Sequence, residues 1–284
     1  MNINSKTKTI CLIGHPVAQS FSPNIHNFLF NKYEKNCVYI CYDIEPDNLK
    51  NAINGLKALD VLGFNITIPY KVDVIRYLDE VDKNAKLIGA VNTVKNEGGI
   101  LKGYNTDGKG FVKSILDKGY KVEGKKIMII GAGGSCRSIA VELASNKVKS
   151  IEIKNRTKEK ALDIVNIINN NFYTKAKFSG DKINKDDLND IDILINTTPI
   201  GMGNNQCPID REIVPNKKIL VCDIVYKPHE TEFVKWANKN NLNTIYGIDM
   251  LINQGLEAFK IWTNINTTIE DKNKIDNIYL NSIK

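Results

Sequence analysis

One stretch, residues 125–140 (KKIMIIGAGGSCRSIA), limits what the chain can fold into more than any other. Four consecutive apolar residues at 127–130 predict a strand in the middle of a sheet, buried on both faces. Three glycines follow: Gly131, Gly133 and Gly134. Apolar residues then recur at helical spacing: Ile139, Ala140 and Leu143. This order predicts a dinucleotide site, because amides at the start of a helix can bind phosphate oxygens.

The glycine pattern departs from the usual G-x-G-x-x-G in one place, since Cys136 stands at its third glycine position. A small side chain there still lets the helix pack on the strand. The alternative is an ordinary glycine-rich turn, which would account for a match without a flanking strand and helix. The context favours a nucleotide site built from the turn and the helix start: Gly131, Ala132, Gly133, Gly134 and Ser135.

Composition excludes several classes of protein. A chain of 284 residues can form one large or two medium domains. The net charge of +7 comes from lysines spread along the chain without interleaved aromatics, so we expect attraction for small anions but no nucleic-acid groove. The six cysteines form no C-x-x-C pair, and the three histidines stand outside any metal-ligand spacing, so we expect reduced thiols and no metal. No segment resembles a signal core or a membrane span, and we therefore expect a cytoplasmic protein.

Strands and helices alternate in two series. The first has predicted strands at 9–13, 38–44, 61–68, 91–94 and 100–104, with helices starting at Ser22, Asp47 and Asp107 and a short helix near 74–78. The second has predicted strands at 127–130, 150–154, 191–195, 219–225 and 243–246. Residues 166–171 suggest a frayed helix end, and the chain closes with an amphipathic helix at 250–263 and a polar tail. Two such series predict two α/β domains with a cleft between them.

Polar side chains gather in loops that follow the predicted strands. Ser22 could simply cap the helix that begins at Pro23, whereas Ser20 has no such explanation. Asn65 and Thr67 share one face of a strand, as the lining of a pocket would. Taken alone, Lys71 would be a solvated surface lysine and Asp107 a helix cap.

Together these loops resemble the shikimate dehydrogenase family. The matching strings, in family order from residue 14 to about 259, are SFSP, NITIPYK, GAVNT, GYNTDG, GAGGSCRSIA, NRT, NTTPIGM, DIVYKP and GIDMLINQGLEAF. The resemblance implies an N-terminal substrate domain, a Rossmann-type domain and a C-terminal helix that returns to the first domain. It implies domain bounds of 1–106 with 247–284 for the substrate domain and 107–246 for the NADP domain.

The resemblance also implies the reaction and the site residues. The activity would be the reversible NADP-dependent conversion of shikimate to 3-dehydroshikimate in chorismate and aromatic amino acid biosynthesis. Lys71 and Asp107 would be the catalytic pair. The remaining substrate contacts would be Ser20 and Ser22 to the carboxylate, and Asn65, Thr67, Asn92, Tyr226 and Gln254 around the ring. The further cofactor contacts would be Asn155, Arg156, Thr157, Lys160, Thr197, Met202, Ile224 and Gly247.

The end of the second Rossmann strand bears on the choice of cofactor. NAD enzymes carry an acidic residue there, but Glu152 comes too early, inside the strand. Arg156 can instead pair with a 2′-phosphate and stack on adenine. The family's NADP-selective members have a further arginine where this chain has Lys160, which softens the selectivity. A solvated helix start is the alternative for these basic residues.

Two other functions remain open at this point. One is an NAD-dependent quinate/shikimate dehydrogenase, against which the missing acidic residue counts. The other is a nonenzymatic regulator that binds nucleotide or shikimate, which the joint presence of Lys71, Asp107 and Gln254 disfavours. The oligomeric state is open too, with a homodimer as one option.

Overall fold

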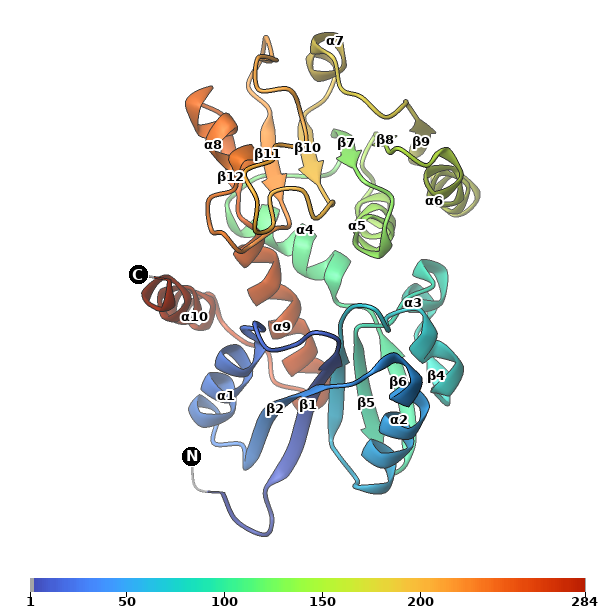
Figure 1. Cartoon of the computed structure of the whole chain (residues 1–284), viewed down its shortest axis with the longest axis vertical. Helices are drawn as coiled ribbons and strands as arrows, with labels where there is room; N and C mark the ends of the chain where they lie inside the picture. The colour runs from blue at the N-terminus through green and yellow to red at the C-terminus, as the bar shows by residue number, and fades with distance from the viewer. Residues whose placement is uncertain (1–2, 284) are drawn as a thin grey trace. The chain divides into compact units, whose positions relative to one another are not determined.

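The structure is a computed structural model that describes residues 3–283, and it divides into two compact units (Figure 1). Unit 1 comprises Met1–Thr106 with Ile252–Lys284, and unit 2 comprises Asp107–Leu251. Each unit contains one six-stranded sheet with helices, so the predicted α/β fold class is confirmed. The second boundary falls inside helix α9 (Gly247–Thr263), whereas the sequence prediction puts it at the start of that helix.

Unit 1 has a mixed sheet of strand order β2-β1-β3-β5-β6-β4. Its strands are β1 (Lys8–Gly14), β2 (Cys37–Asp43), β3 (Gly63–Ile66), β4 (Glu80–Val81), β5 (Thr93–Glu97) and β6 (Ile100–Tyr104). Strands β2, β1 and β3 are parallel, and β5 and β6 form an antiparallel hairpin. Its other elements are α1 (Ser22–Lys32), η1 (Pro46–Asn48), α2 (Leu49–Ala58), η2 (Asp73–Tyr77), α3 (Lys83–Ile88) and α10 (Ile269–Ser282).

The far end of α9 belongs to unit 1 and packs on its sheet. The Trp262 indole donates a hydrogen bond to the Val94 carbonyl over 2.9 Å. It lies so close to Gly63 that a Cβ built there would be 2.4 Å from the indole nitrogen. A glycine in β3 therefore lets the C-terminal helix approach the strand, as the family resemblance implies for the returning helix.

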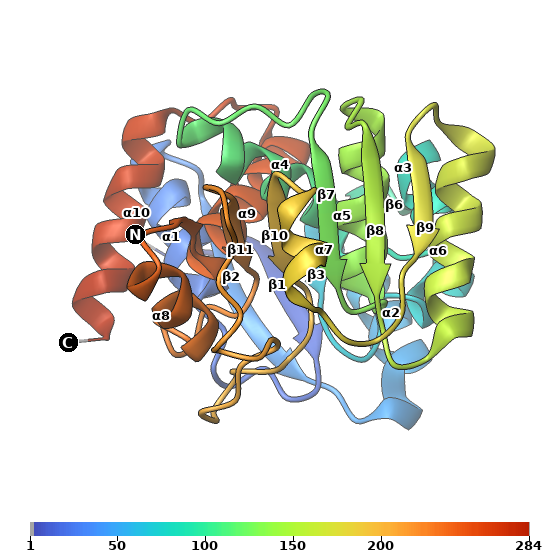
Figure 2. The same ribbon diagram turned by 90° about the horizontal axis from the view of Figure 1, so that it is seen from above.

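Unit 2 has a fully parallel sheet of strand order β12-β11-β10-β7-β8-β9. The strands are β7 (Lys126–Ile130), β8 (Ser150–Lys154), β9 (Lys175–Phe178), β10 (Ile193–Asn196), β11 (Leu220–Asp223) and β12 (Asn243–Ile245). The helices are α4 (Asp107–Asp117), α5 (Gly134–Ser145), α6 (Lys158–Asn171), α7 (Lys185–Asn189) and α8 (Glu232–Lys239). Figure 2 shows β7, β8 and β9 side by side, with α5 and α6 next to them. This is the doubly wound order of the Rossmann fold, whose strand order reverses between β7 and β10.

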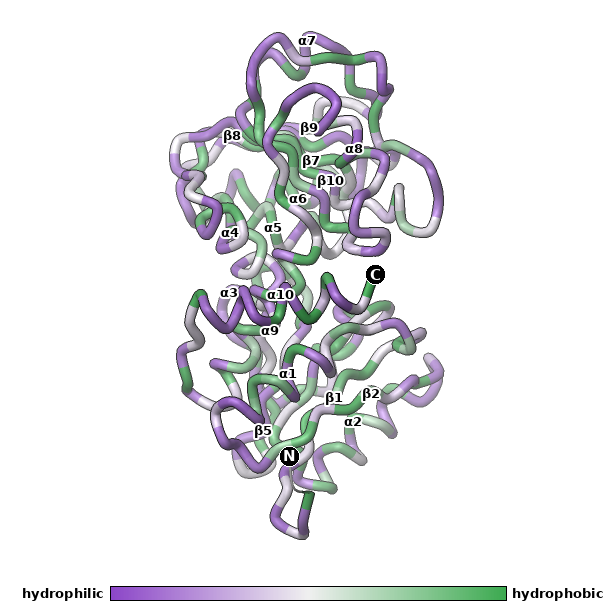
Figure 3. Tube along the Cα trace, turned by 90° about the vertical axis from the view of Figure 1, so that its left-hand side faces the viewer, coloured by the Kyte–Doolittle hydropathy of each residue, from purple (hydrophilic) through white to green (hydrophobic). Residues whose placement is uncertain are grey.

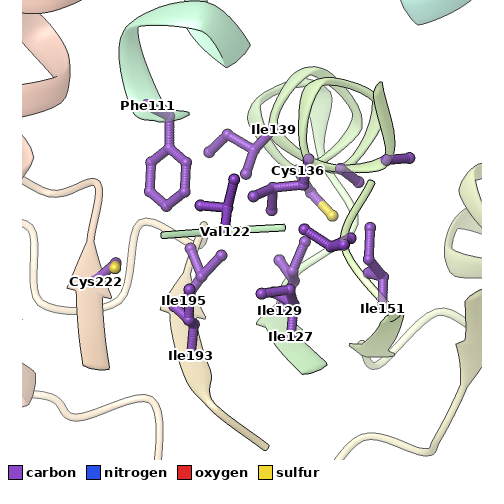
Figure 4. Close-up of a cluster of buried hydrophobic side chains, with 14 of the residues drawn as sticks. Phe111, Val122, Ile127, Ile129, Cys136, Ile139, Ile151, Ile193, Ile195 and Cys222 are labelled. Atoms are coloured by element: carbon purple, nitrogen blue, oxygen red, sulfur yellow. The ribbon is translucent and has the colours of Figure 1, made fainter. Parts of the chain in front are cut away.

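Hydrophobic residues concentrate in the central strands of unit 2, such as β7 and β10 (Figure 3). Figure 4 shows the resulting core, where Phe111 and Ile139 from two helices face Ile129 and Ile195 from two strands. All four side chains are almost fully buried. At about 25 cal/mol per Å² of apolar surface, each such side chain stabilises the fold by about 1.5–3 kcal/mol. The core fixes the carboxyl ends of β7 and β10, where ligands bind in folds of this kind.

The local expectations are confirmed in part. Residues 166–171 form the C-terminal end of helix α6, and the short helix expected near residue 75 is the 3-10 helix η2. The segment expected as a polar tail forms helix α10, and β9 has no counterpart in the prediction. Among residues 3–283, no helix is both long and apolar enough to cross a bilayer.

All six cysteines are free thiols. Cys11 in β1 and Cys136 in α5 are completely buried, and burial raises the pKa of each to about 12. Burial also raises the pKa of Cys222 in β11 well above its usual value. A neutral, buried thiol is chemically inert.

Candidate active site

In unit 1 the loops after β1 and β3 lie against each other. The Thr67 amide donates to the Ile13 carbonyl (3.0 Å), and the His15 amide donates to the Ile68 carbonyl (2.9 Å). A Cβ on Gly14 would lie only 2.2 Å from the Thr67 methyl carbon. Glycine at position 14 is thus what allows the loop that carries Ser20 to approach the loop that carries Thr67 and Lys71.

Ser20 and Ser22 are linked through the backbone at the start of α1. The Ser22 amide donates to the Ser20 hydroxyl oxygen over 3.2 Å. Phe21 is the N-cap residue, and no side chain caps this helix. The alternative that Ser22 caps this helix is therefore wrong, because Ser22 is already the first helical residue.

Asn65 lies on β3 and is buried by a set of hydrogen bonds within unit 1. Its side-chain oxygen accepts from the Tyr39 hydroxyl (2.7 Å), and its amide nitrogen donates to the Asn92 carbonyl and the Thr93 hydroxyl (both 3.0 Å). Both amide protons of Asn65 are therefore engaged by the protein. Thr67 lies just beyond the end of β3 and is half-buried.

Asn92 is the centre of a second cluster, which joins β5, the end of β6 and α9. Its amide nitrogen donates to the Thr106 hydroxyl (3.0 Å) and to the Gln254 side-chain oxygen (3.4 Å), and its oxygen accepts from the Thr106 amide (2.8 Å). The Thr93 hydroxyl also donates to this oxygen over 3.0 Å. Asn92, Thr106 and Gln254 are at most 9% exposed, so the cluster is desolvated and fixed. The sequence prediction does not include Thr106 as a site residue, although it lies inside the GYNTDG string.

The two predicted catalytic residues belong to different units. Lys71 is half-buried in unit 1, and its carbonyl accepts a 2.7 Å hydrogen bond from the Val91 amide, next to Asn92. Asp107 is buried and is the first residue of both α4 and unit 2, directly after Thr106. Gly108 brings α4 against α5, since a Cβ there would lie 2.4 Å from the Ser138 carbonyl oxygen.

His15, which the sequence prediction treats as a structural residue, forms an ion pair at the edge of the unit 1 loops. Its Nδ1 lies 2.5 Å from Asp43, the last residue of β2, and its Nε2 lies 3.9 Å from Glu45. The other Asp43 oxygen accepts from the Val17 amide (3.3 Å). The hydrogen bond to Asp43 raises the pKa of His15 and lowers that of Asp43, and both side chains are partly exposed.

The glycine turn of unit 2 occupies the reversal point of the parallel sheet. Gly131 has a φ of +102°, and a Cβ there would lie 2.8 Å from the Thr197 hydroxyl, which itself donates to the Ile130 carbonyl (2.7 Å). Gly133 and Gly134 differ from Gly131, because a Cβ on either would meet nothing within 4 Å. They begin the 12-residue helix α5, which has neither a side-chain cap nor an acidic residue in its first turn. This open, amide-rich helix start fits a diphosphate group.

Basic side chains are exposed after β8: Arg156, Lys158 and Lys160. The Asn155 side-chain amide donates to the Thr157 carbonyl (2.7 Å) and closes this loop. Glu152 pairs with Lys177 across β8 and β9 (2.9 Å), which fits the prediction that it stays inside the sheet. Within the described residues, no hydrogen bond or ion pair engages the Arg156 guanidinium. Residues 155–158 carry no carboxylate, and Glu159, which is exposed in the first turn of α6, is the first acidic residue after them.

The remaining predicted residues lie at the other strand ends of unit 2. Met202 is 65% exposed and follows β10, and Ile224 and Tyr226 are half-buried after β11. Burial raises the pKa of Tyr226. At Gly247 a Cβ would lie 2.5 Å from the Val225 carbonyl oxygen, so only glycine lets α9 begin beside this loop.

A buried hydrogen-bond network that was not predicted stabilises the ends of strands β10 and β11. The Asp223 carboxylate accepts from the side-chain amide of Asn196 (2.9 Å) and from the Thr231 hydroxyl (2.6 Å), and burial raises the pKa of Asp223. It ties the ends of β10 and β11 together below the loops. In the described part of the chain, no group of three or more His, Cys, Asp or Glu residues is arranged to hold a metal ion.

Comparisons with known proteins agree with this architecture. Three family models match: the shikimate dehydrogenase substrate binding domain at residues 12–94, the shikimate / quinate 5-dehydrogenase model at 111–224, and the shikimate 5′-dehydrogenase C-terminal domain at 247–266. A shikimate dehydrogenase (NADP(+)) from Methanocaldococcus jannaschii is 49% identical over 94% of this chain and 95% of its own length.

Solved structures give the same result. A shikimate dehydrogenase in complex with NADP+ has a TM-score of 0.91 at 45% identity, covering 100% of this chain and 98% of the other. A shikimate 5-dehydrogenase from Listeria monocytogenes in complex with shikimate and NAD has a TM-score of 0.90 at 31% identity, covering 98% of both chains. With its two sheets, its glycine turn and these relatives, the chain belongs to the shikimate dehydrogenase family.

Proposed function

We propose that this protein is an NADP-dependent shikimate dehydrogenase, which reversibly converts shikimate to 3-dehydroshikimate. The observation that carries the proposal is the buried cluster of Asn92, Thr106 and Gln254 in unit 1. Three segments far apart in sequence converge there on amide and hydroxyl groups. A small ring with three hydroxyls and a carboxylate requires such an array of short polar partners.

For the substrate, we assign the carboxylate to Ser20 and Ser22 and the ring hydroxyls to Thr67, Asn92 and Gln254. Both amide protons of Asn65 are engaged, and its side-chain oxygen already accepts from the Tyr39 hydroxyl, so Asn65 can offer a ligand only the second lone pair of that oxygen. We assign Tyr226 as a further substrate contact. The bonds within the protein fix Asn65, Asn92 and Gln254 before a ligand arrives, which reduces the entropy lost on binding.

For the cofactor, the start of α5 supports binding of a diphosphate by the residues around Gly133, and Arg156 supports binding of a 2′-phosphate. The nicotinamide cofactor, when bound, donates or accepts the hydride. We place the other cofactor contacts at the strand ends already described: Asn155, Thr157, Lys160, Thr197, Met202, Ile224 and Gly247.

Lys71 and Asp107 then divide the proton chemistry. As the substrate carbonyl oxygen gains the electron pair of its C=O bond, the Lys71 ammonium donates a proton to it. In the oxidative direction the neutral amine takes the hydroxyl proton back. We assign Asp107 as the acidic member of the catalytic pair, and we expect no metal to take part.

Other properties follow from the same proposal. The six free thiols, four of them buried, support a cytoplasmic location, and the scattered lysines give no reason to expect a nucleic-acid partner. We expect the substrate to be the principal partner. The oligomeric state stays open, with a homodimer as one option that light scattering would test.

An absorbance assay at 340 nm with shikimate or quinate, each paired with NADP+ or NAD+, tests the proposal. The expected result is that shikimate with NADP+ gives the highest kcat/KM of the four pairs. A higher value for quinate with NAD+ would favour the alternative dehydrogenase. No turnover with any pair, alongside measurable binding of shikimate by calorimetry, would favour a nonenzymatic regulator.

A further inference from the structure

The C-terminal helix α10 contacts the substrate-binding loop through an aromatic pair. Phe21, which lies between Ser20 and Ser22, packs against Tyr279 of α10 with ring centroids 5.3 Å apart and planes at 79°. Both rings are buried, at 8% and 3% exposed. An edge-to-face pair of this kind has a defined geometry, so it restricts the rotamer and position of Phe21.

The position of Phe21 determines where both serines lie. Phe21 is the N-cap residue of α1, and its carbonyl accepts from the Asn24 amide over 3.0 Å. No side chain caps this helix, so packing of the Phe21 ring replaces the usual hydrogen bond in holding its first turn. The bond from the Ser22 amide to the Ser20 hydroxyl spans the same residue.

The other end of α1 is attached to α10 as well. Asp271, which is fully buried, accepts hydrogen bonds from Lys32 and from the Tyr33 hydroxyl (2.6 Å). It also caps α10 together with Thr268. Burial alone would raise the pKa of Asp271, but the bonds from Lys32, Tyr33 and Thr268 outweigh burial and lower it to about 2. The carboxylate is therefore charged at neutral pH and anchors α10 to α1.

We propose that Tyr279 of α10 is a positioning residue for the substrate carboxylate, which acts through Phe21 on Ser20 and Ser22. This inference rests on the proposed function of the two serines. Tyr279 is not itself expected to touch the substrate. Its loss should weaken shikimate binding while leaving the cofactor and the chemical step almost unchanged.

The test compares three variants of the full-length protein. Tyr279→Ala should raise KM for shikimate about tenfold, which corresponds to about 1.4 kcal/mol, with kcat and KM for NADP+ within about twofold of the parent. Tyr279→Phe keeps the ring and should restore KM to within about twofold. Ile275→Ala is the matched control, because Ile275 is a fully buried residue of the same helix that forms no ring contact with Phe21. It should lower Tm without changing KM.

An unchanged KM in Tyr279→Ala, or an equal rise in Ile275→Ala, would overturn the proposal. If Tyr279→Ala does not fold, Phe21→Leu removes the same contact from the other side and should give the same rise.

Two further measurements separate this proposal from the proposed function. Hydrogen exchange of the amides at residues 20–25 should be faster in Tyr279→Ala than in Ile275→Ala, whether or not shikimate is the substrate. Equal rates would refute the idea that Tyr279 holds the first turn of α1 in place through Phe21. The double variant of Ser20→Ala and Ser22→Ala should raise KM for shikimate at least as much as Tyr279→Ala. A normal KM for shikimate in this double variant, together with faster exchange in Tyr279→Ala, would contradict the role of the serines. It would still support the role of Tyr279 in positioning Phe21.

Discussion

Replacing Gly133 with alanine tests whether this glycine is required for cofactor binding rather than for the fold. Its φ of −89° and ψ of −171° suit alanine, and the added Cβ would meet nothing within 4 Å. The smaller entropy of the unfolded chain favours the variant by about 0.4–1 kcal/mol. Alanine is a poorer N-cap than glycine, which costs about 0.5–1 kcal/mol. These two effects nearly cancel, so the free energy of unfolding should change by less than about 1 kcal/mol.

Cofactor binding should respond very differently to the same change. The Cβ would occupy the space at the start of α5 where we place the diphosphate, and at least one charge-assisted hydrogen bond worth about 1.5–3 kcal/mol would be lost. We therefore expect Kd for NADP+ to rise by about 10- to 150-fold, measured by fluorescence titration of NADPH. KM for shikimate should change little.

Gly131→Ala is the control for this experiment, because its φ of +102° strains any L-residue and its Cβ would lie 2.8 Å from the Thr197 hydroxyl. Such strain costs about 1–3 kcal/mol before the steric contact is added, so this variant should lose stability. If Gly133→Ala bound NADP+ with the parent Kd, the assignment of the diphosphate to this helix start would be refuted.

Three further predictions concern individual side chains. Lys71→Ala should lower kcat by about 10²–10⁴-fold with a smaller change in KM, and Lys71→Arg should not restore it; a kcat within a few-fold of the parent in stopped-flow assays would make the lysine a binding residue only. Arg156→Ala should raise KM for NADP+ far more than KM for NAD+, by the loss of about 1.5–3 kcal/mol, and equal effects would contradict a 2′-phosphate contact. The hydrogen bond to Asp43, with Glu45 nearby, raises the pKa of His15 in the folded protein above the value of 6.5 that applies to the unfolded chain. The ion pair between His15 and Asp43 therefore stabilises the fold fully below pH 6.5, and this stabilisation is lost as the pH rises through the higher folded pKa. His15→Asn should therefore lower Tm more at pH 6 than at pH 9, and a difference independent of pH would exclude the ion pair.

Much of the fold was predictable because its signals are local. The apolar run at 127–130 and the glycines after it correspond to β7 and the start of α5. Helix α10 shows the limit of such reasoning. Its buried face includes Asp271, a charged residue that periodicity assigns to solvent. The groups that compensate this charge, on Lys32 and Tyr33, come from the opposite end of the chain, and no local pattern contains them.

The candidate site shows the same division between local and distant information. The family strings named Asn65 and Asn92, because each lies in a short motif next to a strand. They did not reveal that Tyr39 and Thr93 engage the Asn65 side chain, or that Thr106 joins Asn92 to Gln254. These bonds depend on which strands become neighbours, and that is decided by the whole sheet.

The buried thiols give each unit a chemical reporter of its own opening. Cys11 belongs to the sheet of unit 1 and Cys136 to the first turn of α5 in unit 2. Neither can react with an alkylating reagent until the surrounding structure opens, because burial keeps both protonated and covered. Their labelling rates, followed by mass spectrometry of the resulting peptides, would read the local unfolding free energy of two parts of one chain in a single sample. Added NADP+ should slow modification of Cys136 more than that of Cys11.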